Sequence, residues 1–175
     1  MEYAELQVTS NFSFLRGASH PEELIDRAAE LGYRAMALTD HNTLAGLVRA
    51  HQAAKMSNLQ FIPGARLDLK DGPSLLAYPT DKDAYSRLSN LLTVGMRRVE
   101  KGECALSKSD VYAHATGMKF LLIPPHRTNS FFEPDPSFIR DAAEYRDAFG
   151  ADVYLAATRR FRDDDDILLY QLHEL

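Results

Sequence analysis

The chain has little of several features that would narrow its class at once. It contains one cysteine, Cys104, and no tryptophan among its 175 residues. A single cysteine excludes an internal disulfide framework and a multi-cysteine zinc knuckle, and it is typical of the reducing cytoplasm. No run approaches the roughly 18 apolar residues of a transmembrane helix, and the start over Met1–Glu5 is acidic where a signal peptide would be basic. We therefore expect a cytoplasmic protein without membrane contact.

Positively charged residues are also fewer than negatively charged ones. The formal net charge is −5 at pH 7, so the chain has no general attraction for polyanions, and nucleic acid could bind only at a local basic patch. A glycine-rich phosphate loop and a G-x-S-x-G nucleophile elbow are both absent. Two dense basic clusters are present: Arg97, Arg98 and Lys101, and Arg159, Arg160 and Arg162. DNA-phosphate contact is one interpretation of these clusters, and we favour solvated surface or contact with an adjoining domain.

Apolar periodicity predicts alternating strands and helices. Strands are expected over 5–9, 35–39, 61–62, 65–69, 74–78, 119–123 and 152–157. Helices are expected over about 19–31, 43–56, 82–94 and 107–117, and two more are expected to begin at 135 and near 163. Ser19 with Glu22, and Ser107 with Asp110, have the spacing of helix capping boxes. Lys70–Pro73 is expected to form the turn of a β-hairpin.

Two of the predicted helices carry expectations for their buried faces. The helix over 43–56 is expected to pack Leu44, Leu47, Val48 and His51 inward. The helix from 135 is expected to bury Phe138, Ile139, Ala142 and Ala143. The four acids over 163–166 suit the start of the last helix, because negative charge is favourable at a helix amino terminus.

Repeated strand–helix units of this length indicate a parallel α/β sheet or barrel. With 45% hydrophobic residues, the chain can bury one sizeable core and is expected to form one domain. About five units fit, whereas an eightfold barrel typically needs about 250 residues. Either the sheet is open or the chain is part of a larger protein.

The most informative segment is Thr39–Asn42, which follows the apolar run over 35–38. It places an acid, Asp40, beside an imidazole, His41, at a strand's carboxyl end, where parallel α/β folds carry their chemistry. The earlier strand offers Gln7 and Thr9, where a metal site would need imidazoles. This combination suggests a catalytic scaffold that lacks part of its site.

Four segments resemble a known family. Residues 3–17 (YAELQVTSNFSFLRG), 37–46 (ALTDHNTLAG), 62–69 (IPGARLDL) and 91–104 (LLTVGMRRVEKGEC) are similar to the amino terminus of bacterial C-family DNA polymerases, above all the error-prone branch. That region is the polymerase and histidinol phosphatase (PHP) domain. The resemblance implies an α/β fold, part of a distorted (βα)7 barrel with mostly parallel strands and a β-hairpin near residues 65–78. It also implies a single PHP-type domain over 1–175, truncated on its carboxyl-terminal side.

Active members of this family hold metal ions with histidines and acids at the strand ends and hydrolyse phosphoesters. Gln7 and Thr9 match two of the family's metal-binding histidines, and Arg16 and Arg66 match positions of further ligands. Neutral groups are poor ligands for divalent metals, and two permanent cations would repel a metal ion. These four positions indicate a degenerate metal site without catalytic residues, so we expect no metal cofactor in this chain.

Asp40 and His41 match the family's second motif, and His126 lies near a further ligand position. These three residues are the remaining metal candidates. The favoured interpretation is that Asp40 caps the following helix, that His41 hydrogen-bonds within a polar pocket and that His126 is a loop residue. A single imidazole cannot hold zinc usefully, since catalytic sites take three protein ligands. A related hypothesis pairs the Arg66 and Arg16 side chains with Asp40 or Glu5 in place of the metal charge.

The resemblance implies a parent that is a DNA-directed DNA polymerase, a nucleotidyltransferase that copies damaged templates in translesion synthesis and DNA repair. Its magnesium-binding active site would lie outside this chain, which would brace the remaining domains. The expected partners are those domains, DNA through the parent, and other replication or mutagenesis proteins. One alternative is a manganese- or zinc-dependent phosphoesterase or 3′–5′ exonuclease with a sparse metal site. Another is a free-standing adaptor.

Overall fold

The computed structural model describes residues 3–125, 135–159, 161 and 165–174. Its strands are β1 (Ala4–Val8), β2 (Ala35–Leu38), β3 (Gln60–Pro63), β4 (Ala65–Leu67), β5 (Leu75–Pro79), β6 (Met118–Leu122) and β7 (Val153–Leu155). Its α-helices are α1 (Pro21–Glu30), α2 (Leu47–Ser57), α3 (Lys82–Arg97), α4 (Lys108–His114), α5 (Pro136–Phe149) and α6 (Asp165–His173), and a short 3-10 helix covers Gly150–Asp152. Within these residues no helix has the length and apolar character needed to cross a bilayer.

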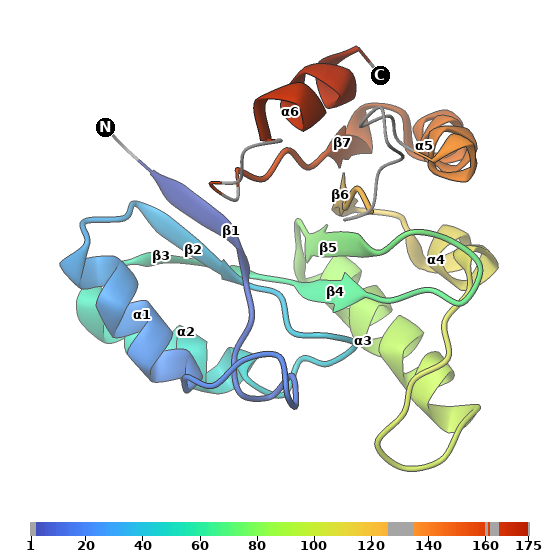
Figure 1. The fold of residues 1–175 in the computed structure, drawn as a ribbon. Helices are drawn as coiled ribbons and strands as arrows, with labels where there is room; N and C mark the ends of the chain where they lie inside the picture. Colours follow the sequence, from blue (N-terminus) through green and yellow to red (C-terminus); the bar gives the residue numbers. More distant parts are fainter. Residues whose placement is uncertain (1–2, 126–134, 160, 162–164, 175) are drawn as a thin grey trace.

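The strands form two sheets. One is parallel, in the order β1-β2-β3, and the other has the order β4-β5-β6-β7 (Figure 1). In the second sheet β5 runs antiparallel to both β4 and β6, while β6 and β7 are parallel. Among the described residues, three of the five strand pairs are therefore parallel, and the expected hairpin over 65–78 is present. β1 and β7 lie at the outer edges, so the described strands form an open α/β layer and do not close into a barrel.

Both sheets are covered on their outer faces by helices. Helices α1 and α2 pack against the three-stranded sheet, and α3, α4 and α5 cover the other sheet (Figure 1). All four residues of β2 are buried; Met36 and Leu38 pack with α1 and α2, whereas Ala37 packs between the sheets with Leu76 and Tyr78. This two-sided burial explains the continuous apolar run of β2, because strands covered on both faces do not need to alternate.

The two sheets are joined where β2 and β3 end. The β2 continuation at His41 forms a parallel bridge with Arg66 of β4. The Arg66 amide donates to the Asp40 carbonyl at 3.0 Å, and the Asn42 amide donates to the Arg66 carbonyl at 2.8 Å. Gly64 separates β3 from β4, and a Cβ there would lie 2.9 Å from the Tyr78 ring, so only glycine fits without displacing it. The carboxyl end of β2 is thus tied to the second sheet.

Several helix limits differ from the sequence predictions. α2 begins at Leu47 rather than near residue 43, because Asn42 adopts φ +52° and its backbone and side chain bond to the β4 segment. The capping box of α1 is formed by His20 and Glu23, one residue after the predicted pair. α3 extends to Arg97. The capping box at Ser107 and Asp110 and the helix start within the acidic run are confirmed.

Some predicted buried residues are exposed. Val48, Ile139 and His51 all lie on the solvent side of their helices. The ring of His51 contacts Phe61 only loosely, with centroids 6.2 Å apart. The later start of α2 and the packing of α1 against it set which face is covered, and the helical period alone could not define that face.

The core of the second sheet contains one buried hydroxyl without a hydrogen-bond partner among the described residues, that of Tyr145. Burial raises the pKa of this phenol, so it stays protonated. We expect Tyr145→Phe to leave the free energy of unfolding unchanged or to raise it by up to about 1 kcal/mol, because no hydrogen bond is lost. Urea unfolding followed by circular dichroism measures the change.

Tyr112→Phe is the matched control, because the Tyr112 hydroxyl donates to Glu144 at 2.6 Å. Its loss should lower the free energy of unfolding by about 0.5–1.5 kcal/mol. A larger loss for Tyr145→Phe than for Tyr112→Phe would contradict the assignment of an unsatisfied hydroxyl.

Candidate functional site

The buried carboxylate of Asp40 is the centre of the polar residues at the strand ends. Its side chain is 2% exposed, and it accepts three hydrogen bonds. One oxygen accepts from the Ser10 amide at 2.8 Å and the Ser13 hydroxyl at 2.6 Å, and the other accepts from the Ser10 hydroxyl at 2.7 Å. Asp40 therefore binds the loop after β1, and it does not cap α2, whose N-cap is Gly46. The capping prediction was wrong.

The loop over 10–17 is shaped around this carboxylate. The Ser13 hydroxyl also accepts from the His41 amide at 2.9 Å, so one side chain contacts two successive residues of the β2 continuation. Gly17 closes the loop against β1, because a Cβ there would lie 2.3 Å from the Ser10 carbonyl oxygen. Ser10 and Ser13 are both buried. The serines are thus the partners that let an acid lie inside the protein.

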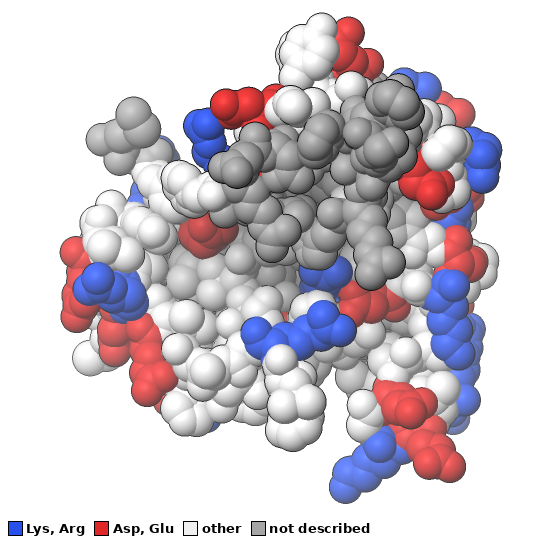
Figure 2. Space-filling model, viewed as in Figure 1, with Lys and Arg blue, Asp and Glu red and all other residues white. Residues whose placement is uncertain are grey.

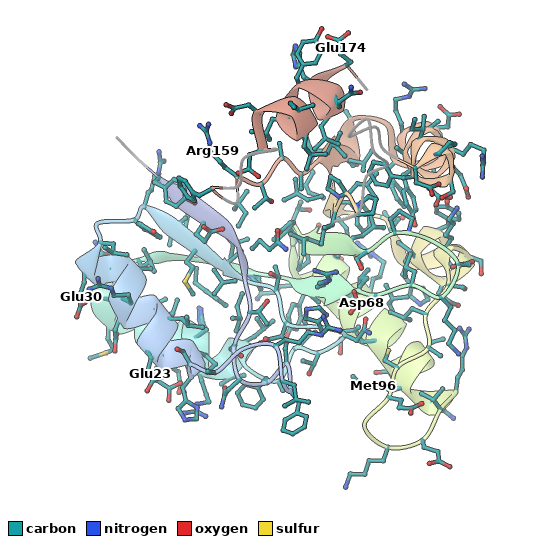
Figure 3. All side chains as sticks on the ribbon, in the orientation of Figure 1. Glu23, Glu30, Asp68, Met96, Arg159 and Glu174 are labelled. Atoms are coloured by element: carbon teal, nitrogen blue, oxygen red, sulfur yellow. The ribbon has the colours of Figure 1, made fainter. Side chains whose placement is uncertain are left out.

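A second carboxylate, Asp68, gathers the neighbouring polar groups. One of its oxygens accepts from His41 Nδ1 at 2.6 Å, and the other accepts from Arg66 Nε at 2.9 Å and from the Ser74 hydroxyl at 2.6 Å. The Asp68 amide donates to the Asn42 side chain at 3.0 Å. Figure 3 labels Asp68 near the middle of the molecule, beside β4. We call Arg66, Asp68, His41 and Ser74 the Asp68 clamp.

The electrostatics of the clamp favour the ionised acid. Burial by itself would raise the pKa of Asp68, but hydrogen bonds from His41, Ser74 and Arg66 outweigh burial and hold this pKa well below its ordinary value. Because Asp68 accepts, His41 Nδ1 carries the hydrogen of their bond. Arg66 therefore pairs with Asp68, and the hypothesis that it pairs with Asp40 or Glu5 was wrong. Arg16, the other arginine in that hypothesis, is exposed on the loop.

The other positions of the expected metal site line two adjoining clefts. Gln7 and Thr9 line a cleft of about 680 Å³ between β1 and the segment after β7, and Arg66 lines a cleft of about 650 Å³ beside α5; Ile123 and Pro124 border both. His126 lies outside the described residues. Within the part of the chain that the structure describes, no group of three or more His, Cys, Asp or Glu residues could hold a metal ion. The described donors therefore do not fit a divalent-metal centre, since Asp40 and Asp68 both bind the protein's own donors.

Each basic cluster contains an arginine that forms an ion pair within the chain. Arg98 binds Asp110 with two hydrogen bonds of 2.5 and 2.7 Å, which fixes the loop between α3 and α4. Arg159 pairs with Asp166, and the other two arginines of that cluster lie outside the described residues. Positive and negative side chains are interspersed over the face shown in Figure 2. Cys104 is half-buried, and burial raises the pKa of its thiol, as expected for an unreactive cysteine.

Sequence reasoning found Asp40, His41 and Arg66 but missed their partners. Ser10 and Ser13 lie two and five residues after the end of β1, and Asp68 lies two residues after Arg66, on the same side of an extended segment. From this spacing of two residues, the pairing of Arg66 with Asp68 could have been predicted. No comparable signal links Asp40 to two serines about 30 residues earlier.

The fold and the site together define an α/β protein: an open layer with buried polar clusters at the carboxyl ends of its strands. The chain belongs to the PHP domain family, whose profile matches residues 5–160. It is 47% identical over 174 residues to an error-prone DNA polymerase of Caulobacter vibrioides and 43% identical over 175 residues to error-prone DNA polymerase 2 of Agrobacterium fabrum. These matches cover 99% and 100% of this chain, but only the amino-terminal 16% of each relative.

Solved structures support the fold. A protein from Bifidobacterium adolescentis, proposed to be a metal-dependent phosphoesterase, matches with a TM-score of 0.66 at 17% identity, over 99% of this chain and 84% of that one. An amidohydrolase from Chromobacterium violaceum matches with a TM-score of 0.60 at 19% identity, over 86% of this chain and 75% of that one. At these identities the likeness concerns the fold alone.

We expect Asp40→Ala to lower the free energy of unfolding by about 3 kcal/mol or more, because three buried donors lose their acceptor. Urea unfolding measures this change. Asp26→Ala, at an exposed position of α1, is the control and should change it by no more than about 0.5 kcal/mol. Equal effects of the two substitutions would show that Asp40 does not hold the loop.

The Asp68 clamp should make the free energy of unfolding depend on pH in the acidic range. The folded pKa of Asp68 lies below its ordinary value of 3.8, so the carboxylate stabilises the fold above that value, and this contribution is lost as the pH falls through the folded pKa. We expect the free energy of unfolding to fall less steeply in Asp68→Asn than in the wild type between about pH 5 and pH 2. Urea titrations at several pH values test this. Parallel profiles would contradict it.

Proposed function

We propose that this chain is the amino-terminal PHP domain of an error-prone DNA polymerase and that its strand-end site holds the fold together without hydrolysing phosphoesters. The observation that carries the proposal is the state of the two carboxylates. Asp40 and Asp68 each accept three hydrogen bonds from donors of the protein, and Arg66 brings a permanent cation to the site. A metal-dependent phosphoesterase needs carboxylate and imidazole lone pairs that are free to converge on metal ions.

The relatives support the wider part of the proposal. The chain spans about 16% of the two error-prone DNA polymerases described above. In this view the whole polypeptide is a cytoplasmic nucleotidyltransferase that extends DNA primers across lesions, with its magnesium-binding residues outside this chain. The chain is then one PHP-type domain that further polypeptide completes. The cleft between the edge strand β1 and the segment after β7 is consistent with such completion.

The partners follow from the same proposal. The other domains of the polypeptide would pack against this one. DNA would be contacted through those domains, because the net negative charge of this chain does not attract nucleic acid. Further replication or mutagenesis proteins would bind the assembled polymerase. A structural role suits a domain with helices on the outer faces of both sheets.

We expect the purified chain, incubated with manganese or zinc and desalted, to retain less than stoichiometric metal and to show no metal-dependent hydrolysis. Elemental analysis measures the metal, and turnover is measured with a phosphomonoester and with 3′-labelled single-stranded DNA. His41→Ala is the control, because an activity of this site would be lost in it and a contaminant would persist. Stoichiometric metal with turnover that disappears in His41→Ala would favour the alternative phosphoesterase or exonuclease with a sparse metal site.

A further inference from the structure

The tip of the loop after β1 presents two large apolar side chains to solvent. Phe14 is 85% exposed and Leu15 is 89% exposed, although both belong to a loop that is anchored in the core. They are the central residues of a turn in which the Ser13 carbonyl accepts from the Arg16 amide at 2.9 Å and the Gly17 amide at 3.2 Å. Figure 1 shows this loop at the lower edge of the molecule, between β1 and α1.

The loop is held in one shape. The hydroxyl of Ser13, directly before Phe14, is bound to the buried Asp40, and Gly17 fits tightly against Ser10. Leu15 has φ +61°, at the turn position where glycine is favoured. Folding stability alone would favour glycine here, so the exposed leucine is not explained by the loop's own packing. A fixed loop with protruding apolar groups loses little entropy when it binds, which favours docking.

The loop also meets α2. Phe12 is partly exposed beneath the turn, and the Arg49 guanidinium lies 6.0 Å from the centre of its ring. Val48, the neighbour of Arg49, is largely exposed. Arg16 borders the turn and is exposed. We call Phe12, Phe14, Leu15 and Arg16 the loop patch: exposed apolar side chains beside one arginine.

We propose that Phe14 and Leu15 dock into an apolar pocket on another domain of the same polypeptide, with an acidic residue at its rim opposite Arg16. This inference rests on the proposed function, because it needs the longer chain. The match to only 16% of each relative leaves a large surface tethered to this domain, where the effective concentration is high. Aromatic residues, phenylalanine included, are enriched in the cores of protein interfaces, and Phe14 is an exposed aromatic side chain.

Single-stranded DNA is a less suitable occupant of the loop patch. Bases could stack on Phe14, but Leu15 would stay in water, and the backbone would meet little positive charge. Arg49, the second cation near the patch, already pairs with Glu22. The net charge of −5 adds repulsion at longer range.

The test places the photo-cross-linker benzoylphenylalanine at position 14 of the full-length polypeptide. We expect a cross-link, mapped by mass spectrometry, to a segment of the same molecule beyond residue 175, with or without primer–template DNA. A cross-link only to DNA, a cross-link between two copies, or no cross-link would each overturn the inference. A finding of phosphoesterase activity would overturn the proposed function and leave this result unaffected, so the two failures are distinguishable.

A pair of variants provides an independent measurement. In the full-length polypeptide, Phe14→Ser combined with Leu15→Gly should increase the rate of limited proteolysis between this domain and the next, because the docked contact is lost. Leucine to glycine suits the turn at φ +61°, so the loop itself keeps its shape. Met56→Ser is the control, since Met56 is 90% exposed at the other end of α2. Proteolysis rates that match this control would overturn the inference.

Discussion

The structure depends on the hydrogen bonds of one buried carboxylate. β2 is buried on both faces, so the chain carries Asp40 directly into the interior, where an ionised group is stable only with donors around it. Ser10 and Ser13 supply those donors and thereby fasten the loop after β1 to the end of β2. The position of His41 follows, because its amide bonds to Ser13. The hydrogen bonds of Asp40 therefore fix the loop that carries the loop patch, and they help to position His41 of the Asp68 clamp.

The Asp68 clamp shows how an arginine changes the chemistry of a strand-end site. A carboxylate that faces water keeps lone pairs available for a metal ion, whereas the Asp68 oxygens accept hydrogen bonds from Arg66, His41 and Ser74. The guanidinium supplies positive charge that cannot dissociate or be exchanged, so the cluster stabilises the junction of the two sheets. This balance supports the proposal that the site maintains architecture in a domain of a polymerase.

Much of the fold could be predicted from local pattern. The strands, the hairpin over 65–78 and the capping box at Ser107 and Asp110 were found because each depends on residues close in sequence. The predictions failed where distant contacts decide the outcome. α2 starts late because Asn42 is bound to β4, and His51 lies outside because α1 covers a different face of α2. The site was half predicted: Asp40, His41 and Arg66 were identified, but their pairing was not.

The sequence by itself determined the alternation of strands and helices, the family, and the presence of arginine, glutamine and threonine where a metal site would need ligands. These properties are local, since periodicity and residue identity can be read along the chain. Only the tertiary structure decided that Ser10 and Ser13 satisfy Asp40, that Arg66 pairs with Asp68, and that Phe14 and Leu15 are exposed on a hydrogen-bonded turn. Hydrogen-bond partners are set by distances in space, and residues about 30 apart in the chain come together only through the packing of the sheets.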